Sequence, residues 1–335
     1  MFEVIFIEEH LKAHSKVTEI LKRFPNSEVK YIDKVEDVFQ RVKKPYLQKR
    51  TNLNLFLGEK KGQLVKIAPP AYGLSGEPHY YFVHAYNCIY ECNYCYLQGY
   101  FHSPDIVLYL NHEEIGEEIK KTAASHSNTK VWFHAGEYSD SLALTTLSGE
   151  LAFYFKLFEN LSNAYLELRT KSVNIRELLK EKPLPNIITS FSLSPENRCK
   201  TNDLKTPSLK ARLEAISTLH QAGFPIGLHF DPIIYEDDLL ENYQTLCDQV
   251  LEVLPAESIR YISLGVVRFT KDVYHLVQKN YPDSDLLAQE FVRSFDNKIR
   301  YPRPMRLWIL SKIKQLLVDR GVDASRIYLC MEDDE

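Results

Sequence analysis

The chain has 335 residues, of which 44 % are hydrophobic and 26 % charged, and its formal net charge is −4. This is the balance of an ordinary globular protein, and the length suits one large α/β domain or two smaller ones. It excludes a globally basic nucleic-acid binder, although a local basic groove is compatible with it. No stretch reaches the roughly 18 apolar residues of a membrane span, and the opening MFEVIFIEEH does not resemble a secretory signal. We therefore expect a cytoplasmic monomer with reduced cysteines and no membrane partner.

The N-terminal part of the chain predicts a small α/β domain over residues 1–66. Its predicted strands are FEVIFIEE (2–9), EVKYID (28–33) and LNLFLG (53–58), and its predicted helices are HSKVTEILKRF (14–24) and VEDVFQRV (35–42). The following segment, IAPPAYGLSGEP (67–78), is rich in proline and glycine and is typical of a loop or linker.

From residue 79 onward, strand and helix patterns alternate regularly. The predicted strands are 79–85, 130–136, 164–170, 186–194, 225–233 and 260–269, and the predicted helices between them are 112–126, 147–161, 174–181, 208–223 and 239–254. Such alternation implies parallel strands with helical crossovers. We predict an α/β fold, a partial (β/α)6 barrel over residues 79–335, extended by a helix at 304–320 and a last strand at 326–330. In this architecture the chemistry lies at the carboxyl ends of the strands.

Three cysteines follow the first barrel strand. Cys88, Cys92 and Cys95 lie in NCIYECNYCYLQGYF, spaced C-x3-C-x2-C, which favours a metal site over a disulfide framework. A structural zinc site needs four ligands, and the remaining candidates are Cys199, Cys247 and Cys330. The last two fall within a predicted helix and strand, as buried core thiols do. A cubane iron–sulfur cluster held by only three cysteines keeps one iron open, and the spacing favours that arrangement.

With Tyr94 before the third cysteine, the motif resembles that of the radical S-adenosylmethionine (radical SAM) superfamily. The resemblance implies a [4Fe–4S] cluster whose open iron binds the amino and carboxylate groups of SAM. It further implies one-electron cleavage of SAM to a 5′-deoxyadenosyl radical, which abstracts hydrogen from the substrate, and an electron donor such as flavodoxin or ferredoxin.

Further segments resemble one family, the spore photoproduct lyases. They are CNYCYLQGYF, IFIEE near the start, TPSL with GFPIG, and RFTK with KNYP, so the resemblance runs from about residue 1 to 310. It implies a carbon–carbon lyase that repairs a thymine–thymine crosslink in ultraviolet-damaged DNA. DNA or a modified nucleic acid is then the expected substrate.

The sequence departs from this family just after the second barrel strand. There the family has a cysteine that returns hydrogen to the product radical, whereas FHAGEYSD (133–140) places Glu137 at that position. Gly136 and Glu137 resemble the Gly-Glu pair with which other radical SAM enzymes hold the SAM amino group. A carboxylate suits an ammonium because a charge-assisted hydrogen bond is about twice as strong as a neutral one. A solvated loop carboxylate is the alternative.

Other matches bear on SAM and on radical transfer. The resemblance directs Lys171 and Ser192 to SAM, with a surface lysine and a strand serine as the alternatives. It places Tyr94 near the adenine and assigns Tyr94 and Tyr96 to radical relay, for which simple packing is equally open. Cys199 lies in SPENRCK, which we expect to be a loop over the barrel mouth. It is therefore the candidate for a relocated hydrogen donor, with a surface thiol of no role as the alternative. If Cys199 is not the donor, Tyr96 can be, or 5′-deoxyadenosine gives its hydrogen back and SAM is regenerated.

His229 and Asp231 stand on the fifth barrel strand, where the lyases are apolar. They have the same parity and so point to one side of the sheet. If that side is the barrel interior, the substrate site is more polar than a lyase site. An ordinary core histidine is the alternative.

The segment RSFDNKIRYPRPMR (293–306) carries five cations, one acid and two aromatic residues. This pattern suits phosphate contact and base stacking. Arg300 and Tyr301 match a family pair near the lesion-binding hairpin, and Arg268 lies at the end of the sixth strand. We expect these three residues to contact the substrate, with a solvated loop as the alternative.

The favoured interpretation is a radical SAM enzyme of the spore photoproduct lyase type. The second is a radical SAM enzyme with a different substrate on the same scaffold, because the donor cysteine is absent. A non-catalytic iron–sulfur or damage-binding protein is the third, and the cysteine motif together with Lys171 and Ser192 argues against it.

Overall fold

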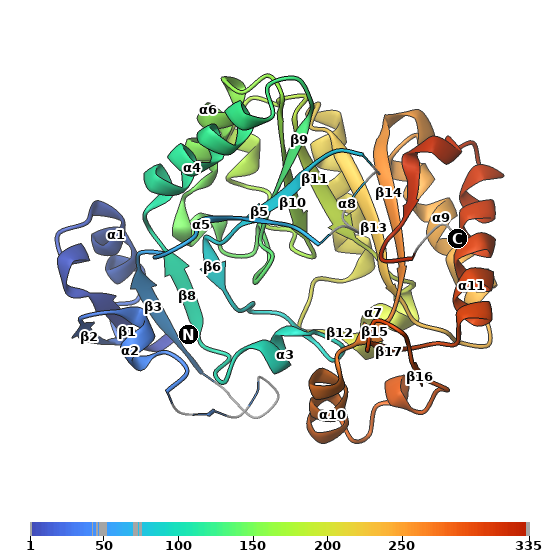
Figure 1. Ribbon diagram of the computed structural model, residues 1–335, viewed down its shortest axis with the longest axis horizontal. Helices are drawn as coiled ribbons and strands as arrows, with labels where there is room; N and C mark the ends of the chain where they lie inside the picture. Colours follow the sequence, from blue (N-terminus) through green and yellow to red (C-terminus); the bar gives the residue numbers. More distant parts are fainter. Residues whose placement is uncertain are drawn as a thin grey trace.

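The computed structural model describes residues 2–41, 43–44, 46, 52–69, 73 and 76–332. Two large sheets dominate the described chain, and the chain colours in Figure 1 show the N-terminal unit beside the larger one. Two small sheets complete it, one of β7 (Glu91–Cys92) with β12 (Asp203–Leu204), the other of β15 (Arg268–Phe269), β17 (Ile299–Arg300) and β16 (Val292–Arg293).

The first sheet has the strand order β2-β1-β3-β8-β6. Its strands are β1 (Phe2–Glu8), β2 (Glu28–Ile32), β3 (Leu53–Gly58), β6 (Ala85–Tyr86) and β8 (Ile106–Tyr109). The helix α1 (Ser15–Arg23) packs Val17 and Ile20 into its core. The helix α2 is shorter than predicted, Val35–Val38, and residue 42 of the predicted helix lies outside the described residues. Because β6 and β8 come from beyond residue 79, the N-terminal sheet is completed by chain from the barrel region.

The second sheet is the barrel, with the strand order β18-β14-β13-β11-β10-β9-β5-β4. Its strands are β4 (Val65–Ile67), β5 (His79–Phe82), β9 (Val131–Ala135), β10 (Ala164–Thr170), β11 (Ile187–Ser192), β13 (Ile226–Ile233), β14 (Ile259–Val266) and β18 (Ile327–Leu329). Apart from the antiparallel edge strand β4, neighbouring strands pair in parallel. The sheet does not close on itself, so the predicted partial α/β barrel is confirmed.

The helices α4 (His112–Ser125), α6 (Leu151–Glu159), α8 (Leu209–Gln221), α9 (Leu239–Val253) and α11 (Arg303–Val318) lie on the outside of the barrel sheet (Figure 1). The helices α3 (Leu97–Tyr100) and α10 (Lys271–Asn280) lie below the sheet in that view, and α5 (Thr145–Ser148) and α7 (Glu196–Asn202) are short. Short 3-10 turns occur at η1 (Glu9–Leu11), η3 (Leu178–Lys180), η4 (Ala256–Ser258), η5 (Asp285–Leu287) and η6 (Ala324–Arg326).

Several predicted elements differ from the structure. The predicted helix 147–161 is divided at Gly149 into α5 and α6, and the end of the predicted strand 260–269 forms β15 in another sheet. The predicted strand 79–85 is divided, because β5 ends at Phe82 and the chain crosses to the first sheet as β6. The predicted helix 174–181 is only the turn η3, since Pro183 and Pro185 follow within a few residues and a proline disfavours helical backbone before it.

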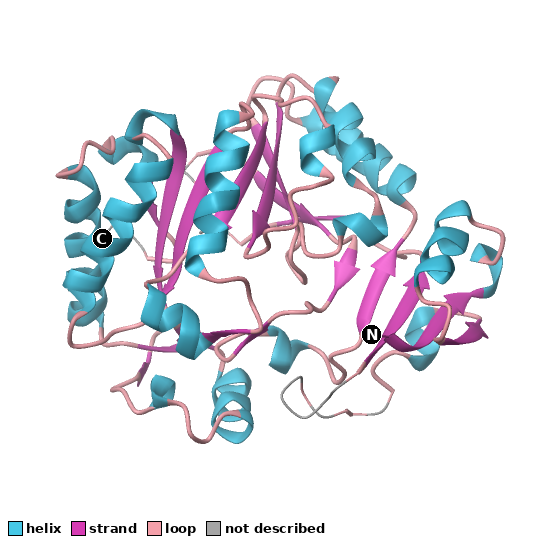
Figure 2. Cartoon of the chain, turned by 180° about the vertical axis from the view of Figure 1, so that it is seen from behind, coloured by secondary structure: helices cyan, strands magenta, loops and turns pink. Residues whose placement is uncertain are grey.

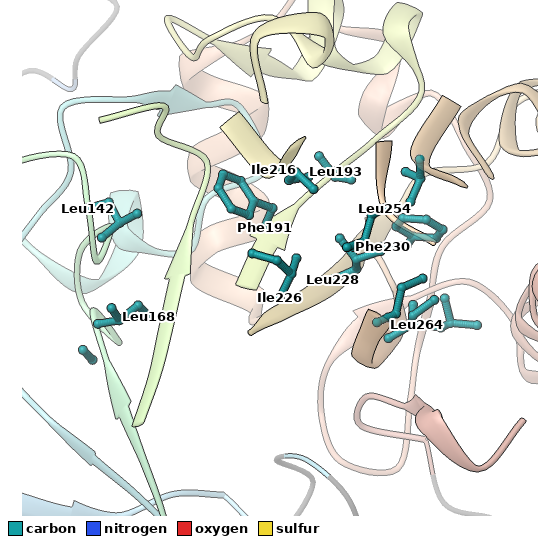
Figure 3. Close-up of a cluster of buried hydrophobic side chains, with 14 of the residues drawn as sticks. Leu142, Leu168, Phe191, Leu193, Ile216, Ile226, Leu228, Phe230, Leu254 and Leu264 are labelled. Carbon is teal, nitrogen blue, oxygen red and sulfur yellow. The ribbon is translucent and has the colours of Figure 1, made fainter. Parts of the chain in front are cut away.

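The barrel strands are buried on both faces, as the strands of parallel sheets usually are. All six residues of β11 are buried, and they include the polar residues Thr189, Ser190 and Ser192. Figure 3 shows part of this core, where Phe191 of β11 lies beside Ile216 of α8 and Phe230 of β13 lies near Leu264 of β14.

The carboxyl ends of the barrel strands face the side that carries α3, α10 and the β15–β17 sheet (Figure 2). In the described part of the chain, no helix is long and apolar enough to cross a membrane.

Candidate active site

A cavity of about 480 Å³ opens at the carboxyl ends of the barrel strands. Its walls come from the cysteine loop, the ends of β9, β10, β11 and β13, the segment 267–273, Lys298 and Met331. The predicted site residues among its lining are Cys88, Cys92, Tyr94, Cys95, Tyr96, Gly136, Glu137, Lys171, Ser192, Asp231 and Arg268. Residues from distant parts of the sequence thus line one cavity.

Local hydrogen bonds fold the cysteine loop so that its three thiols face this cavity. Cys92 lies on β7, which pairs with β12, and the Asn93 N–H donates to the Asn202 carbonyl at 3.0 Å. The Gln98 side-chain amide donates to the carbonyls of Asn93 and Cys95 at 3.0 and 2.9 Å. Gln98, three residues after the last cysteine, therefore holds the loop in this conformation.

The thiols sit in a buried environment that disfavours thiolates until a cation compensates. Burial raises the pKa of Cys88, Cys92 and Cys95, while the charge of Lys171 lowers the pKa of Cys92 and Cys95. The Tyr90 N–H donates to the Cys88 sulfur at 3.4 Å. Among the described residues no three His, Cys, Asp or Glu groups are arranged around a single ion. In a cubane each cysteine binds a different iron, and three cysteines on one loop are a donor set that fits that group.

Beside the triad lies a buried charged cluster around Asp203. Tyr94 donates its hydroxyl to one Asp203 oxygen, and Arg212, fully buried, donates to the other at 2.9 Å. Lys171 Nζ lies 5.6 Å from the centroid of the Tyr94 ring. Burial lowers the pKa of Lys171, but Asp203 and the thiol of Cys92 more than offset this, so the pKa is raised overall. Lys171 is thus a cation held at the cavity wall.

The loop after β9 brings Glu137 to the same wall. Gly136 has φ +80°, and a Cβ there would lie 2.6 Å from Ser141 Oγ and 2.9 Å from its backbone nitrogen, so only glycine fits. Tyr96 donates its hydroxyl to the Glu137 carbonyl, which links this loop to the cysteine loop. Ser192, at the end of β11, is buried to 6 % exposure and faces the cavity.

The cavity floor is a polar network that the sequence only partly revealed. The fully buried carboxylate of Glu167 accepts hydrogen bonds from groups on four other strands: His134, Ser190 (2.7 Å), His229 (2.7 Å) and Tyr261 (2.6 Å). Burial alone would raise the pKa of Glu167, but Arg169, His134 and His229 hold it well below its usual range. On their own strands, His134 and Glu167 stand at positions that point to the barrel interior, as His229 does. The alternation of side-chain directions along a strand could therefore have predicted this from the sequence.

His229 and Asp231 both face the barrel interior, but with different partners. His229 is bonded to Glu167, and Asp231 forms a bidentate ion pair with Arg268 at 3.1 and 3.2 Å. Asp231 and Arg268 line the cavity, whereas His229 lies beneath it.

The other expected substrate residues are placed differently. Arg300 is 2 % exposed and donates to Glu332 and Ser294, and Tyr301 is fully buried and stacks on Phe291 at 4.9 Å. Neither side chain is presented at the surface. Of the aromatic residues in segment 293–306, Phe295 is the exposed one, at 82 %.

Cys199 does not lie on a loop, and that part of the expectation is wrong. It belongs to α7, is 7 % exposed, and donates its thiol to the Ser194 carbonyl at 3.2 Å. It is not among the described residues that line the cavity.

An open α/β barrel with a three-cysteine loop after its first strand is the fold class of the radical SAM proteins. Comparisons with known proteins place the chain within that class. The family model for spore photoproduct lyase matches residues 3–304. The chain therefore belongs to the spore photoproduct lyase family.

Two curated relatives agree with this placement. The spore photoproduct lyase of Bacillus subtilis (strain 168) is 28 % identical over 214 residues, and that of Geobacillus sp. (strain Y412MC61) is 26 % identical over 216 residues. Each match covers 63 % of both chains, slightly less than two thirds of the relatives' length.

Solved structures show the same fold. A spore photoproduct lyase with a single cysteine-to-serine mutation superposes with a TM-score of 0.83 at 18 % identity, covering 98 % of both chains. A doubly mutated spore photoproduct lyase with bound AdoMet and dinucleoside spore photoproduct superposes with a TM-score of 0.82 at 18 % identity, covering 99 % of both.

Proposed function

We propose that this chain is a radical SAM enzyme that holds a [4Fe–4S] cluster through Cys88, Cys92 and Cys95 and acts on damaged or modified nucleic acid. The observation that carries the proposal is that these thiols share one cavity with Glu137. Membership of the spore photoproduct lyase family supports the substrate class. When bound, the cluster and SAM supply a 5′-deoxyadenosyl radical by one-electron cleavage of the sulfonium.

The protein's own residues bind and orient SAM in this proposal. Glu137 accepts hydrogen bonds from the SAM ammonium, and Lys171 donates to the SAM carboxylate. Ser192, from the neighbouring strand, donates a further hydrogen bond. Tyr94, fixed by Asp203, packs its ring near the adenine, and Tyr96 ties the cysteine loop to the Glu137 loop. The buried floor and walls keep bulk water from the reacting centre.

A second candidate is a radical SAM enzyme with a different substrate. The sequence resemblance puts Glu137 at the position of the family's donor cysteine. The structure adds that the cavity carries the Asp231–Arg268 ion pair above a charged floor, which favours this candidate. A site of this kind suits a ligand with several hydrogen-bonding groups.

The cluster is tested first. Anaerobically reconstituted protein should bind about four irons per chain, as a cubane requires, and SAM should perturb the EPR spectrum of the reduced cluster. Cys92→Ala should lose the iron, whereas Cys247→Ala, buried in α9 away from the cavity, should retain it. Zinc in place of iron in anaerobic material would contradict the proposal.

The substrate is tested by anaerobic turnover with SAM and a chemical reductant, or with a flavodoxin or ferredoxin as the electron donor. Formation of 5′-deoxyadenosine should rise when ultraviolet-irradiated DNA is added, and unirradiated DNA is the control. Cleavage that both DNAs stimulate equally would favour the second candidate. Lesion binding without any SAM cleavage would indicate a non-catalytic protein.

A further inference from the structure

Arg268 directs its donors at both oxygen and sulfur atoms. Its terminal nitrogens donate to the Asp231 carboxylate at 3.1 and 3.2 Å, and one of them also donates to the Val266 carbonyl at 3.0 Å. Its Nε instead points at the thioether sulfur of Met331, at 3.1 Å. Asp231 thereby fixes the guanidinium plane and aims Nε at Met331.

A second cation converges on the same sulfur. Lys298 Nζ lies 3.1 Å from Met331 Sδ, whereas its ion pair with Asp296 is longer, at 3.8 Å. Burial lowers the pKa of Lys298, and the nearby charge of Arg268 lowers it further. Arg268, Lys298 and Met331 all line the cavity. A thioether is a weak acceptor, so two cationic donors converge on an atom that satisfies neither of them strongly.

The backbone around Met331 is anchored, but its side chain can rotate. The Met331 carbonyl accepts from Arg300 at 3.1 Å, and the next residue, Glu332, is held by Arg306 at 2.7 and 3.1 Å and by Arg300 at 3.3 Å. Methionine is unbranched with three rotatable side-chain bonds. The sulfur can therefore leave its position without any movement of the C-terminal segment.

We propose that Arg268 Nε and Lys298 Nζ form an anion subsite in the cavity, in which a phosphate oxygen of the substrate displaces the Met331 thioether. An oxyanion at this point gains two charge-assisted hydrogen bonds in place of two weak N–H···S contacts. The identification of the occupant as a phosphodiester rests on the proposed nucleic-acid function. Free inorganic phosphate offers the same chemistry, and the two sources are separated below.

Methionine methyl resonances test the subsite without a nucleic-acid substrate. The chain has three methionines, Met1, Met305 and Met331, so 13C-methyl labelling gives a spectrum that Met331→Leu assigns. Inorganic phosphate, titrated at constant ionic strength against chloride, should shift the Met331 signal saturably and leave Met305 unchanged. Lys298→Gln should weaken this response about tenfold, since it removes one charged hydrogen bond. Lys200→Gln, an exposed lysine on α7, should respond like the wild type.

Absence of a phosphate-specific shift at Met331, or the same titration in Lys298→Gln, would overturn the subsite. A second arm identifies the source of the phosphate. Titration calorimetry compares the dinucleoside spore photoproduct with the same lesion joined by a phosphodiester. The wild type should prefer the phosphodiester about tenfold, and Lys298→Gln should lose only that preference.

The outcomes separate this inference from the proposed function. Equal binding of the two lesion compounds would refute the phosphodiester assignment while leaving the nucleic-acid function standing. A Met331 response to inorganic phosphate without binding of either compound would support the subsite and count against the nucleic-acid substrate.

Discussion

The carboxylate of Asp140 accepts a hydrogen bond of 2.7 Å from the backbone N–H of Lys171. This bond ties the loop after β9 to the residue that follows β10. Asp140 is buried, and its other oxygen accepts from the Leu142 N–H (3.0 Å), the Ala143 N–H (2.9 Å) and the Thr170 hydroxyl (2.6 Å). The two candidate SAM ligands Glu137 and Lys171 therefore stand on one shared scaffold.

Replacing Asp140 should damage this scaffold. We expect Asp140→Ala to lower the free energy of unfolding by about 2–4 kcal/mol, because buried donors lose a charged acceptor. SAM affinity should fall as well, although Asp140 itself is not proposed to touch SAM. Urea denaturation and equilibrium SAM binding measure the two effects. Asp248→Ala, which removes an exposed ion pair with Arg320, should change both quantities little. If Asp140→Ala is destabilised but binds SAM with normal affinity, the hydrogen bonds of Asp140 are not needed for SAM binding.

The charge of Glu137 should matter for SAM more than its shape. Glu137→Gln keeps the side chain's size and loses its charge, so SAM binding should weaken by roughly 1.5–3 kcal/mol. Anaerobic titration of the reconstituted enzyme measures this, with Glu196→Gln on the surface of α7 as the matched control. Unchanged affinity would leave Glu137 with another task, such as contact with the substrate.

The barrel and its cysteine loop could be predicted because their signals are local. Strand and helix patterns alternate regularly along the barrel, and the three cysteines lie within eight residues. Lys171 and Ser192 were expected at the site because the family resemblance directs them to SAM. Both line the cavity beside the cysteines.

The rest of the site depends on pairings that no local pattern reports. Arg300 was expected to contact the substrate, but it is buried and donates a hydrogen bond to Glu332, 32 residues later. The Glu167 network joins five strands, and an alternating strand pattern does not say which polar residues meet across a barrel. Cys199 was expected on a loop because its segment follows the fourth barrel strand, yet this segment forms α7, which buries the thiol.

The position of Cys199 gives a clear expectation for the missing hydrogen donor. Because its thiol is buried and bonded to the Ser194 carbonyl, we expect Cys199→Ala to leave the products and the rate of turnover unchanged. Product analysis by mass spectrometry after anaerobic turnover is the measurement. Abnormal adducts in this variant alone would mean that α7 moves during the reaction and that Cys199 is the donor after all.

A buried histidine should make the fold sensitive to mild acid. His112 begins α4, and its Nδ1 lies 3.3 Å from the Tyr154 hydroxyl. Burial, with added repulsion from His84, His14 and Lys16, lowers the pKa of His112 to about 3. In the unfolded chain this histidine has an ordinary pKa of about 6.5. Below that pH it therefore binds a proton that it does not bind in the folded protein. The contribution of His112 to the free energy of unfolding is fully present above pH 6.5 and is lost progressively as the pH falls toward 3.

The prediction is a difference in pH dependence between variants. From pH 7 to pH 5 the wild type should lose up to about 2 kcal/mol more unfolding free energy than His112→Gln, whose amide can still bond Tyr154 but does not titrate. Urea denaturation followed by circular dichroism at each pH measures this. His275→Gln, at an exposed position on α10, should keep the wild-type slope and serves as the control for removing a histidine from the surface. Parallel pH profiles for the wild type and His112→Gln would show that His112 is protonated in the folded protein and that its surroundings accommodate the charge.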